Sequence, residues 1–376
     1  MTLGIGIIGA APGRAWASIS HVPAVAAVPG LALRAVATTR PESAAAAGAA
    51  FGTRAYADAR ALIADPAVDV VAVTVRVPAH RDLVLGALEA GKHVYCEWPL
   101  GRDLAEAEAL RDAAAASAPR VAVGLQARLN PALRHAAGLV ASGAIGRVLG
   151  ARLTAETMAF GPRMGEADAY LEDPRNGATH LAIHGGHALD AAAAILGPLA
   201  DVSTLFTTQY PEVAVGAPPR TYRRLIPDDV RLLARLESGA ALSVEVIGGR
   251  GEDSAFRLDV LGSIGSLALT GGAPRGFQSG RLALALNGVP VAVEDGVGGD
   301  LLDLGDLPDP AVNVAHLYAA LGNDIRDGSR TAPSFDDAVR LTRLCADALT
   351  ASGDGRRVPG GEWPRGLKPS GQPQAD

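Results

Sequence analysis

The first part of the chain alternates between short apolar runs and longer Ala-rich stretches. The runs LGIGII, LALRAVA, VDVVAV, HVYC and RVAVG are apolar at most positions, which is typical of strands buried on both faces of a parallel sheet. The stretches between them have a helical pattern, and Gly91 stands where a helix would end. Strands that alternate with helices predict right-handed βαβ units and therefore an α/β fold.

The pattern changes after about Gly150. VRLLARLESGAALSVEVIGG, FRLDVLGSIGSLALTGG and RLALALNGVPVAV alternate apolar and polar residues, which predicts an antiparallel sheet with one covered face. Within these segments ESGA, GSIGS and LNGV are typical of hairpin turns. Two helices are expected to follow, near Asn313 to Asp327 and Phe335 to Ala351.

Composition limits the classes of function. The chain has 376 residues, of which 48% are hydrophobic and 20% are charged, as in globular proteins. Its formal net charge of −6 argues against a nucleic-acid-binding surface. No apolar run approaches the ~20 residues of a membrane helix, and no basic stretch precedes the apolar N-terminus. The two cysteines form no disulfide framework. We therefore expect a cytoplasmic protein that binds neither membranes nor nucleic acid.

The segment LGIGIIGAAPGRAW predicts a strand, a turn of small residues and a helix. This is the context of a dinucleotide-binding fingerprint, because the turn and the free N–H groups of the helix can hold a pyrophosphate. The match to G-x-G-x-x-G is imperfect: Gly9 fits the first position, Ala11 and Arg14 stand at the second and third, and Gly13 comes one residue early. An ordinary βα turn is the alternative interpretation.

The end of the second predicted strand indicates which nicotinamide nucleotide binds. An acidic residue there would accept hydrogen bonds from the ribose 2′-hydroxyl and repel a 2′-phosphate. The sequence ATTR instead offers the hydroxyls of Thr38 and Thr39 and the cation of Arg40, which suits a phosphate. The pattern favours NADP over NAD, and a solvent-exposed loop arginine is the alternative.

Ligands of parallel sheets bind where the carboxyl ends of the strands meet. The turns GAAPGR, TTR, RVPAH and EWPLG gather there, and the VAVGLQ strand ends in the same crevice. The residues that we expect to bind the cofactor are Gly9, Ala10, Ala11, Pro12, Gly13, Arg14, Trp16, Thr38, Thr39, Arg40, Val75, Arg76, Pro78, His80, Glu97, Trp98 and Gln126.

Four segments, GIIGA, VDVVAVTVRVPAHRDLVLGALEAGKHVYCEWPLG, NPALRHAAGLVASGAIGRV and GGHALDAAAAILG, occur in the order and spacing of the Gfo/Idh/MocA oxidoreductase family, which the chain resembles over nearly its whole length. The resemblance implies an N-terminal Rossmann domain, residues 1–124. It also implies a C-terminal α+β domain, residues 125–376, with a large, open, mainly antiparallel sheet, and a homodimer or homotetramer. GAAPGRAWASISHVPAV and EWPLG resemble the branch that includes the NADP-binding inhibitor protein of the fungal galactose switch.

The segment GATHLAIHGGHALD contains three histidines. On a helix, His180, His184 and His187 would fall at i, i+4 and i+7 on one stripe. They could bind a metal, but the segment has no cysteine or glutamate, and we predict no metal site. They could be hydrogen-bonded residues at a domain seam, or they could face the substrate. The resemblance favours the last for His187, because the family's D-x-x-x-H motif places its histidine near the nicotinamide.

Two family residues are missing. The motif aspartate corresponds to Ile183, and the family's catalytic lysine corresponds to Trp98. The only lysines of the chain, Lys92 and Lys368, lie elsewhere. An indole N–H can hold an oxygen or a carboxamide, and its ring can stack on a nicotinamide or a sugar, but it is not a base. Lysine-type catalysis is therefore excluded.

The remaining acid–base candidate is His187, with His184 or Tyr170 as helpers. The segment MAFGPRMGEADAYLEDPRNGATH is expected to form one wall of the substrate pocket. Substrate-binding candidates, each of which could equally be a solvated loop residue, are Arg128, Asn130, Arg163 and Asn176.

The favoured function is an NAD(P)-dependent oxidoreductase acting on a sugar, cyclitol or related polyhydroxy molecule, with hydride transfer to or from the nicotinamide. Two alternatives stay open. One is an NADP-binding sensor that regulates a partner protein, and the other is nicotinamide-assisted non-redox chemistry on a glycoside.

Overall fold

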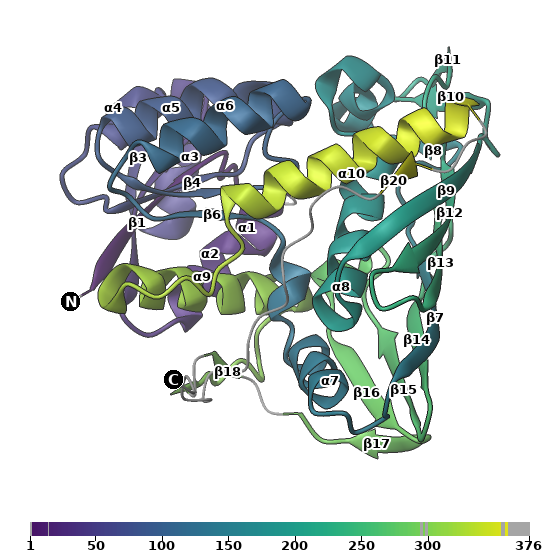
Figure 1. Cartoon of the computed structure of the whole chain (residues 1–376). Coiled ribbons are helices and arrows are strands. Elements are labelled where there is room, and N and C mark those ends of the chain that lie inside the picture. The colour runs from purple at the N-terminus through teal and green to yellow at the C-terminus, as the bar shows by residue number, and fades with distance from the viewer. Residues whose placement is uncertain (1, 14, 294–295, 298–299, 355–357, 360–376) are drawn as a thin grey trace.

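The computed structural model describes residues 2–13, 15–293, 296–297, 300–354 and 358–359, which form two units side by side (Figure 1). The first unit contains a parallel sheet in the order β3-β2-β1-β4-β5-β6. The sequence pattern predicted all of these strands except β3, which has only three residues. Their bounds are β1 (Leu3–Ile8), β2 (Leu31–Ala37), β3 (Arg54–Tyr56), β4 (Val70–Val73), β5 (His93–Cys96) and β6 (Val121–Val123).

Helices cover both faces of this sheet. Buried side chains of α5 and α6 pack on one face, and those of α2 and α9 pack on the other. Helix α5 ends at the predicted glycine, because Gly91 has a φ of +71° and its N–H donates to Leu88 O. The helices of this unit are α1 (Trp16–Ile19), α2 (His21–Ala27), α3 (Pro41–Phe51), α4 (Ala59–Ile63), α5 (His80–Glu89) and α6 (Leu104–Ala115).

The second unit is built on a nine-stranded sheet in the order β17-β16-β15-β14-β7-β13-β12-β9-β20. Only β7 and β13 pair in parallel among its described neighbours; the other pairs are antiparallel. The bounds are β7 (Val148–Glu156), β9 (Leu199–Thr207), β12 (Asp229–Leu236), β13 (Ala241–Ile247), β14 (Phe256–Gly262), β15 (Ser266–Gly271), β16 (Leu282–Leu286), β17 (Val289–Val291) and β20 (Val358–Pro359). The predicted fold class is confirmed.

The three predicted hairpin turns join β12 to β13, β14 to β15 and β16 to β17. In the last, Asn287 and Gly288 have φ values of +52° and +78°, which is the backbone geometry that the Asn-Gly pair favours. Helices α7 (Pro131–Ala141), α8 (Gly186–Leu196) and α10 (Phe335–Asp354) pack on this sheet. Smaller strands are β8 (Arg163–Met164), β10 (Glu212–Val215), β11 (Arg220–Arg223), β18 (Gly296–Val297) and β19 (Asp300–Leu301).

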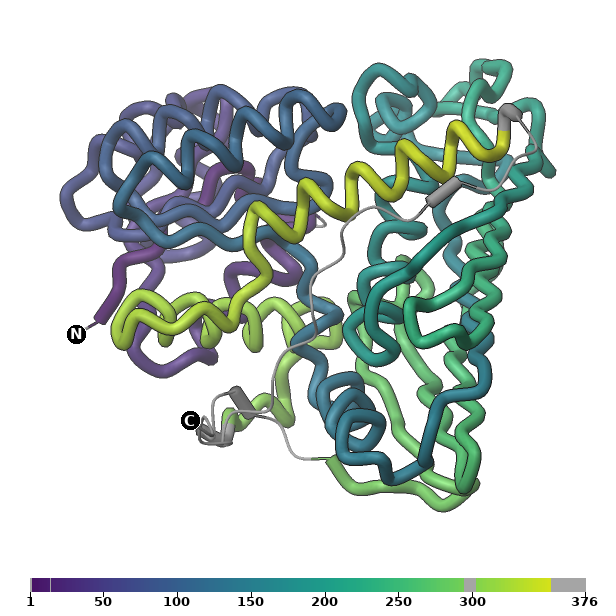
Figure 2. Tube along the Cα trace, viewed as in Figure 1, coloured from purple at the N-terminus to yellow at the C-terminus, as the bar shows by residue number. Residues whose placement is uncertain are grey.

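The two C-terminal helices join the units. Helix α9 (Asp309–Asp327) returns to the first unit and lies beside α2, although nearly 300 residues separate them (Figure 2). Helix α10 packs against α6 at one end and against β9 at the other. The predicted boundary between residues 124 and 125 follows β6 and stays a prediction, because α9 shares the core of the first sheet.

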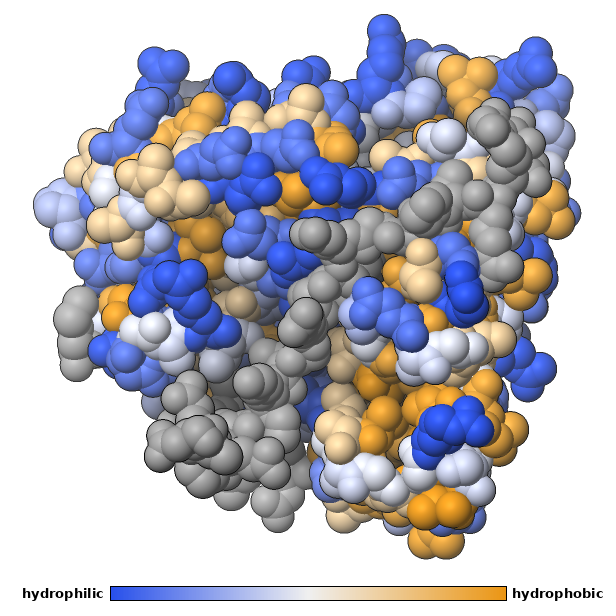
Figure 3. Space-filling view, in the orientation of Figure 1, coloured by the Kyte–Doolittle hydropathy of each residue, from blue (hydrophilic) through white to orange (hydrophobic). Residues whose placement is uncertain are grey.

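The surface is of mixed polarity. On the face drawn in Figure 3, hydrophilic residues are frequent over helices α4 to α6, and hydrophobic residues gather over the lower part of the second unit. A helix that buries only its apolar face leaves its polar face in contact with solvent, which accounts for the hydrophilic residues over these helices. Within the part of the chain that the structure describes, no helix is long and apolar enough to cross a membrane.

Candidate active site

A cavity of about 470 Å³ lies between the two units, within the size range of small-molecule sites. Loops at the carboxyl ends of β5 and β6 form one side, and segments of the second unit form the other. Its lining residues are Trp16, Glu97, Trp98, Gln126, Met158, Ala159, Phe160, Arg163, Met164, Gly165, Asp168, Leu171, Ile183, His184, His187, Arg275, Gln278 and Ser279.

The turn after β1 has the conformation that a phosphate-binding turn needs. Gly9 has a φ of +106°, and a Cβ there would lie 2.8 Å from Thr74 O. Gly13 has a φ of +99° and faces open space, so a ligand can approach its backbone. Both glycines are therefore required by the local geometry. Ala10, Ala11 and Pro12 complete the turn, and Arg14 lies outside the described residues.

The helix after this turn differs from the expectation. It is broken at Ser20 into two short helices, α1 and α2, and the hydroxyl of Ser20 donates to Trp16 O. A four-residue helix has little macrodipole, because the dipole grows with the number of aligned peptides. The backbone of the glycine turn, rather than a helix dipole, is what this site offers to a pyrophosphate.

The end of β2 carries no acidic side chain. Thr38 Oγ1 lies 2.8 Å from Ser43 Oγ, and Thr39 and Arg40 are exposed. Arg40 directly precedes α3, and its backbone oxygen accepts a hydrogen bond from Ser43 Oγ at 3.0 Å. This set of a cation and hydroxyls is suited to a phosphate monoester.

The predicted cofactor residues in the turn after β4 have different surroundings. Val75 contacts the Gly9 turn and Pro78 is exposed. His80 is buried and its ring nitrogens lie 2.9 Å from Val75 O and 3.0 Å from Pro99 O. Burial lowers the pKa of His80, so the ring is neutral. His80 therefore braces two crevice loops and does not face a nucleotide, contrary to its predicted role.

Glu97 belongs to a buried polar group that the sequence did not reveal. Its Oε1 lies 2.9 Å from Nε2 of His21, and Nδ1 of the same histidine lies 2.9 Å from the Tyr318 hydroxyl. His21 is fully buried, and Tyr95 packs on it at 4.9 Å between ring centroids. These residues come from α2, β5 and α9, so only the tertiary structure brings them to the carboxylate in the cavity.

Trp98 takes the place of the family's lysine, and its N–H is already used. The indole Nε1 donates to Ala182 O at 2.7 Å, and a Cβ on Gly186 would lie 2.7 Å from the same atom. The side chain is 6% exposed and lies in the cavity wall. The N–H is therefore not free to hold a ligand, contrary to that expectation, whereas the ring remains available for stacking.

The three histidines lie at the start of the helix that enters the cavity. The chain forms a π-helical turn at Leu181–Gly185 and continues as α8. All three side chains are buried, and His180 Nε2 lies 3.2 Å from Val246 O. His184 and His187 line the cavity, and Nδ1 of His187 has no partner among the described residues.

Burial keeps these histidines neutral. It lowers the pKa of His180 to about 4 and that of His187 to about 3. The pKa of His184 is also well below its usual value, through burial and then through its two histidine neighbours. A neutral imidazole can accept a proton, so the cavity contains proton acceptors at neutral pH. Among the described residues, no group of histidine, cysteine and carboxylate side chains has the arrangement of a metal site.

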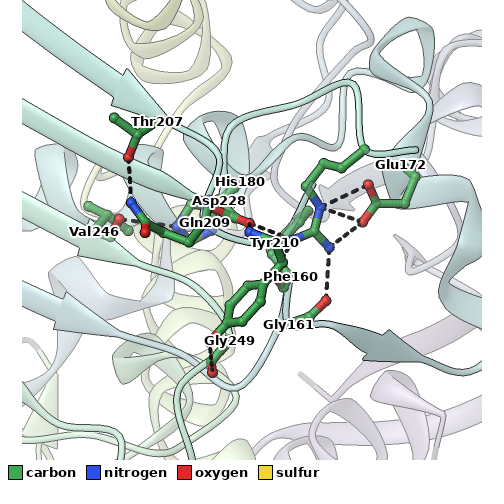
Figure 4. Close-up of polar contacts among 11 residues, drawn as sticks. Phe160, Gly161, Glu172, His180, Thr207, Gln209, Tyr210, Asp228, Val246 and Gly249 are labelled. Carbon is green, nitrogen blue, oxygen red and sulfur yellow. Dashed lines mark hydrogen bonds and ion pairs between the residues drawn. The ribbon is translucent and has the colours of Figure 1, made fainter. Parts of the chain in front are cut away.

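The wall opposite the first unit is held by one buried arginine, Arg224. It donates to the backbone oxygens of Phe160 (2.5 Å) and Gly161 (3.0 Å) and forms ion pairs with Glu172 and Asp228, both at 2.7 Å (Figure 4). Phe160 has a φ of +60°, an unfavourable value for a residue with a Cβ. The Arg224 contacts hold it there.

Asp228 continues the Arg224 network into the second sheet. Its carboxylate accepts hydrogen bonds from the backbone N–H groups of Gln209 (2.7 Å) and Tyr210 (2.9 Å). The ring of Phe160 packs on His180 and His184, at 4.9 and 5.9 Å between ring centroids. The network therefore positions the wall against two of the three histidines.

Tyr170, a predicted helper, lies outside the cavity lining. Arg76 stacks over its ring at 4.6 Å and donates to Ala167 O at 2.6 Å. Burial raises the pKa of Tyr170, so the phenol keeps its proton. These contacts join the two units and engage both side chains, although Arg76 was predicted to bind the cofactor and Tyr170 to assist the acid–base step.

Of the four predicted substrate residues, only Arg163 lines the cavity. Arg128 is buried and forms ion pairs with Asp190 and Asp337. Asn130 caps α7, because its side-chain oxygen accepts from Ala132 N at 3.0 Å.

Asn176, the fourth of these residues, donates to Tyr170 O at 2.7 Å inside its own loop. The sequence does not show that buried carboxylates pair with Arg128 or that Asn130 caps a helix. For this reason these side chains were predicted at the substrate and lie elsewhere. Arg275, Gln278 and Ser279 line the cavity instead, and nothing in the residue pattern marked them.

Comparison with known proteins supports this description. Residues 3–125 match the family described as oxidoreductase family, NAD-binding Rossmann fold, and residues 131–271 match the C-terminal domain of Gal80p. The chain is 39% identical over 168 residues to dehydrogenase aclE of Aspergillus oryzae, covering 44% of this chain and 46% of that protein.

The chain is also 28% identical over 255 residues to levoglucosan dehydrogenase of Pseudarthrobacter phenanthrenivorans, covering 62% of this chain and 63% of that protein. It thus spans about half to two thirds of the length of these curated relatives. A crystal structure of a super-repressor mutant of Gal80p from Saccharomyces cerevisiae has the same fold, with a TM-score of 0.82, 19% identity, and coverage of 96% of this chain and 98% of that one.

Two matched domain models in this order, together with the observed sheets, identify the two units: residues 3–125 are an NAD-binding Rossmann domain of the Gfo/Idh/MocA oxidoreductase family, and residues 131–271 match the C-terminal domain of Gal80p.

Proposed function

We propose that this protein is a nicotinamide-nucleotide-dependent oxidoreductase that interconverts a secondary alcohol and a ketone on a sugar, cyclitol or related polyhydroxy compound. The observation that carries the proposal is His187, which lines a cavity between the two units and whose buried Nδ1 has no hydrogen-bond partner among the described residues. The similarity to levoglucosan dehydrogenase supports a polyhydroxy substrate.

The residues present fit a nicotinamide nucleotide. Gly9 and Gly13 form a turn with open backbone, and Gln126 contributes a buried side-chain oxygen without a partner among the described residues. A bound nicotinamide would accept or supply the hydride. Trp98 offers its ring face, and the Gln126 amide can pair with a carboxamide.

His187 would handle the proton of the same reaction. In the oxidative direction the substrate hydroxyl gives its proton to a ring nitrogen of His187, and in the reductive direction the imidazolium returns it. Because burial lowers the pKa of His187, the imidazolium holds this proton only transiently at neutral pH. Ile183 lines the cavity where the family has an aspartate, so the imidazole has no carboxylate there to orient it.

We also propose that NADP binds more tightly than NAD. The support is the phosphate-compatible set of Thr38, Ser43 and Arg40, with no acidic side chain at the end of β2. The coarse assignment, an NAD-binding Rossmann fold, does not depend on this preference.

The working form is proposed to be a cytoplasmic homo-oligomer. Leu205, Leu233 and Leu261 are 62%, 64% and 57% exposed on the outer face of the second sheet, and both cysteines are free and buried. Light scattering after size-exclusion chromatography tests the assembly; a monomer at micromolar concentration would contradict it.

The test of the enzyme assignment is a screen of sugars and cyclitols with NADP or NADPH, followed at the nicotinamide absorbance. With an active substrate, His187→Ala should lower kcat by about 10²–10⁴ and leave nucleotide affinity unchanged. His135→Ala, an exposed histidine on α7, is the control. Wild-type activity in His187→Ala would remove the proposed proton acceptor.

A second candidate function is a nucleotide-dependent sensor. It is favoured by the match to the Gal80p C-terminal domain and by Trp98 and Ile183 at the places of two family catalytic residues. Tight NADP binding by the wild type without turnover of any compound in the screen would support this function over the enzyme.

A further inference from the structure

Gln278 lies in the short turn Phe277–Ser279, which follows β15 and enters the cavity. Its side chain is 94% buried, since 6% of the residue is exposed. The oxygen Oε1 has no hydrogen-bond partner in the described part of the chain. An unsatisfied buried acceptor costs about 1–3 kcal/mol, so its retention in a cavity calls for a ligand that satisfies it.

The backbone on both sides of Gln278 is anchored. Phe277 stacks on Phe256 with 4.2 Å between ring centroids and 16° between ring planes. Asn313 Nδ2, from the buried face of α9, donates to Gln278 O at 2.9 Å and to Gly280 O at 3.1 Å. Asn130 in turn donates to Asn313 Oδ1 at 3.0 Å. The amide therefore projects from a turn that is tied to both units.

Two glycines let the turn and the Gln278 amide pack closely. Gly276 has a φ of +130°, and a Cβ there would lie 2.6 Å from Oε1 and Nε2 of Gln278. A Cβ on Gly280 would lie 2.4 Å from the backbone of Gly272. The absence of a Cβ at these two positions therefore lets the turn close with the amide packed beside Gly276.

The kind of ligand is indicated by the hydrogen bonds that an amide can form and by the part of the protein that carries Gln278. A side-chain amide pairs with a hydroxyl in either orientation, because a hydroxyl both donates and accepts. The residues suited to the nucleotide come from loops that follow strands of the first sheet, whereas Gln278 comes from the second sheet. His187, which would take the reacting proton, lines the same cavity.

We propose that Gln278 binds one hydroxyl group of the substrate, a neutral polyhydroxy compound, and makes the site select for that hydroxyl. The proposal rests on the function proposed above. A substrate that lacks the hydroxyl leaves the amide buried and unpaired, and such sites reject the deoxy compound strongly.

The experiment pairs a change in the protein with a change in the substrate. The probes are levoglucosan, myo-inositol and D-glucose, followed by each monodeoxy form of the best of them. Gln278→Met keeps the length of the side chain and removes its hydrogen bonds. We expect kcat/KM to fall about 10–100-fold for the parent compound and for every deoxy form but one, the equivalent of about 1.4–2.8 kcal/mol.

For the one deoxy form that lacks the bound hydroxyl, wild type and Gln278→Met should agree within about twofold, because the hydrogen bond is absent from both. NADP affinity should not change. Gln209→Met is the matched control, because it removes only the exposed side-chain hydrogen bond to Thr207 and keeps the backbone N–H that donates to Asp228. It should not alter kcat/KM.

Equal losses for all deoxy forms would mean a structural role, and weaker NADP binding would assign Gln278 to the nucleotide; either overturns the proposal. If the wild type turns over none of the probes, the proposed function fails separately. The affinities of wild type and Gln278→Met for the parent and deoxy compounds are then measured by calorimetry with the NADP-loaded protein. A single deoxy form with equal affinity for both proteins would uphold the proposal, whereas uniform effects or no binding would overturn it.

Discussion

The two sides of the cavity are built in different ways. On the nucleotide side, each contributing loop directly follows a strand of one parallel sheet, and its geometry is local, as at Gly9. On the substrate side, segments far apart in the chain are tied together by buried polar side chains. Arg224 binds Phe160 and Glu172, and Asn313 holds the turn of Gln278.

The difference teaches where specificity resides. A backbone turn recognises a pyrophosphate with little help from side chains, so that side tolerates changes in the rest of the protein. The substrate wall depends on buried charges and amides whose partners must all be present, so single substitutions can displace it. The following predictions test this contrast, from the largest expected effect to the smallest.

Arg224→Met should be the most damaging change. It leaves the Glu172 and Asp228 carboxylates without their cation, and breaking a buried ion pair costs about 3–5 kcal/mol. Arg224→Lys should recover part of this stability yet raise the substrate KM, because one ammonium cannot reach all four partners. Urea unfolding and steady-state kinetics measure the two effects.

The control for Arg224 is Arg81→Met, which removes an exposed pair with Asp82 and should cost less than about 1 kcal/mol. NADP affinity should stay the same in every folded variant. A loss of NADP binding equal to the loss of substrate binding would erase the contrast between the two sides.

The second largest effect is expected from acid, which should lower the free energy of unfolding through the histidines on the substrate side. The folded pKa values of about 4 for His180 and about 3 for His187 lie below the unfolded value of about 6.5. The unfolded chain therefore binds more protons, and the free energy of unfolding should fall as the pH falls below about 6.5. Each histidine contributes a slope of up to about 1.4 kcal/mol per pH unit. Above pH 7 their contribution is constant.

The slope is measured by urea unfolding at several pH values between 7.5 and 4.5. His180→Gln keeps a donor for Val246 O and removes the titrating group, so its slope should be smaller than that of the wild type. An unchanged slope would show that His180 is not one of the groups responsible.

On the nucleotide side, Arg40→Asp should weaken NADP binding about tenfold or more while NAD affinity changes by less than about threefold. The reason is that the proposed NADP preference assigns the Arg40 cation to the 2′-phosphate, which NAD lacks, and a charged hydrogen bond is worth about 1.5–3 kcal/mol. Calorimetric titration of both nucleotides measures this. Arg60→Asp, on exposed α4, is the control. Tighter binding of NAD than of NADP by the wild type would refute the preference.

Trp98→Phe should have the smallest effect. It removes the hydrogen bond to Ala182 O, worth about 1 kcal/mol, and keeps a flat ring in the wall. We expect a small loss of stability and a change in kcat of less than about fivefold, an order-of-magnitude estimate for a lost hydrogen bond. A complete loss of turnover would mean that the indole N–H takes part in the chemistry.

The sequence was sufficient for the fold because periodicity and turn residues are local. Apolar runs predicted five of the six strands of the first sheet, and Asn-Gly predicted the turn between β16 and β17. It was less sufficient for the site. Arg128 and Asn130 were expected at the substrate, and they instead pair with Asp190 and with Asn313.

The sequence by itself determined the local features of the site. These are a glycine turn at Gly9, an end of β2 without an acidic side chain, and the absence of a lysine beside Pro99. Only the tertiary structure decided which polar side chains are consumed inside the protein and which remain open in the cavity. The physical reason is that a buried polar group must be paired, and its partner is set by packing. His21 is paired with Glu97, whereas Oε1 of Gln278 has no partner among the described residues.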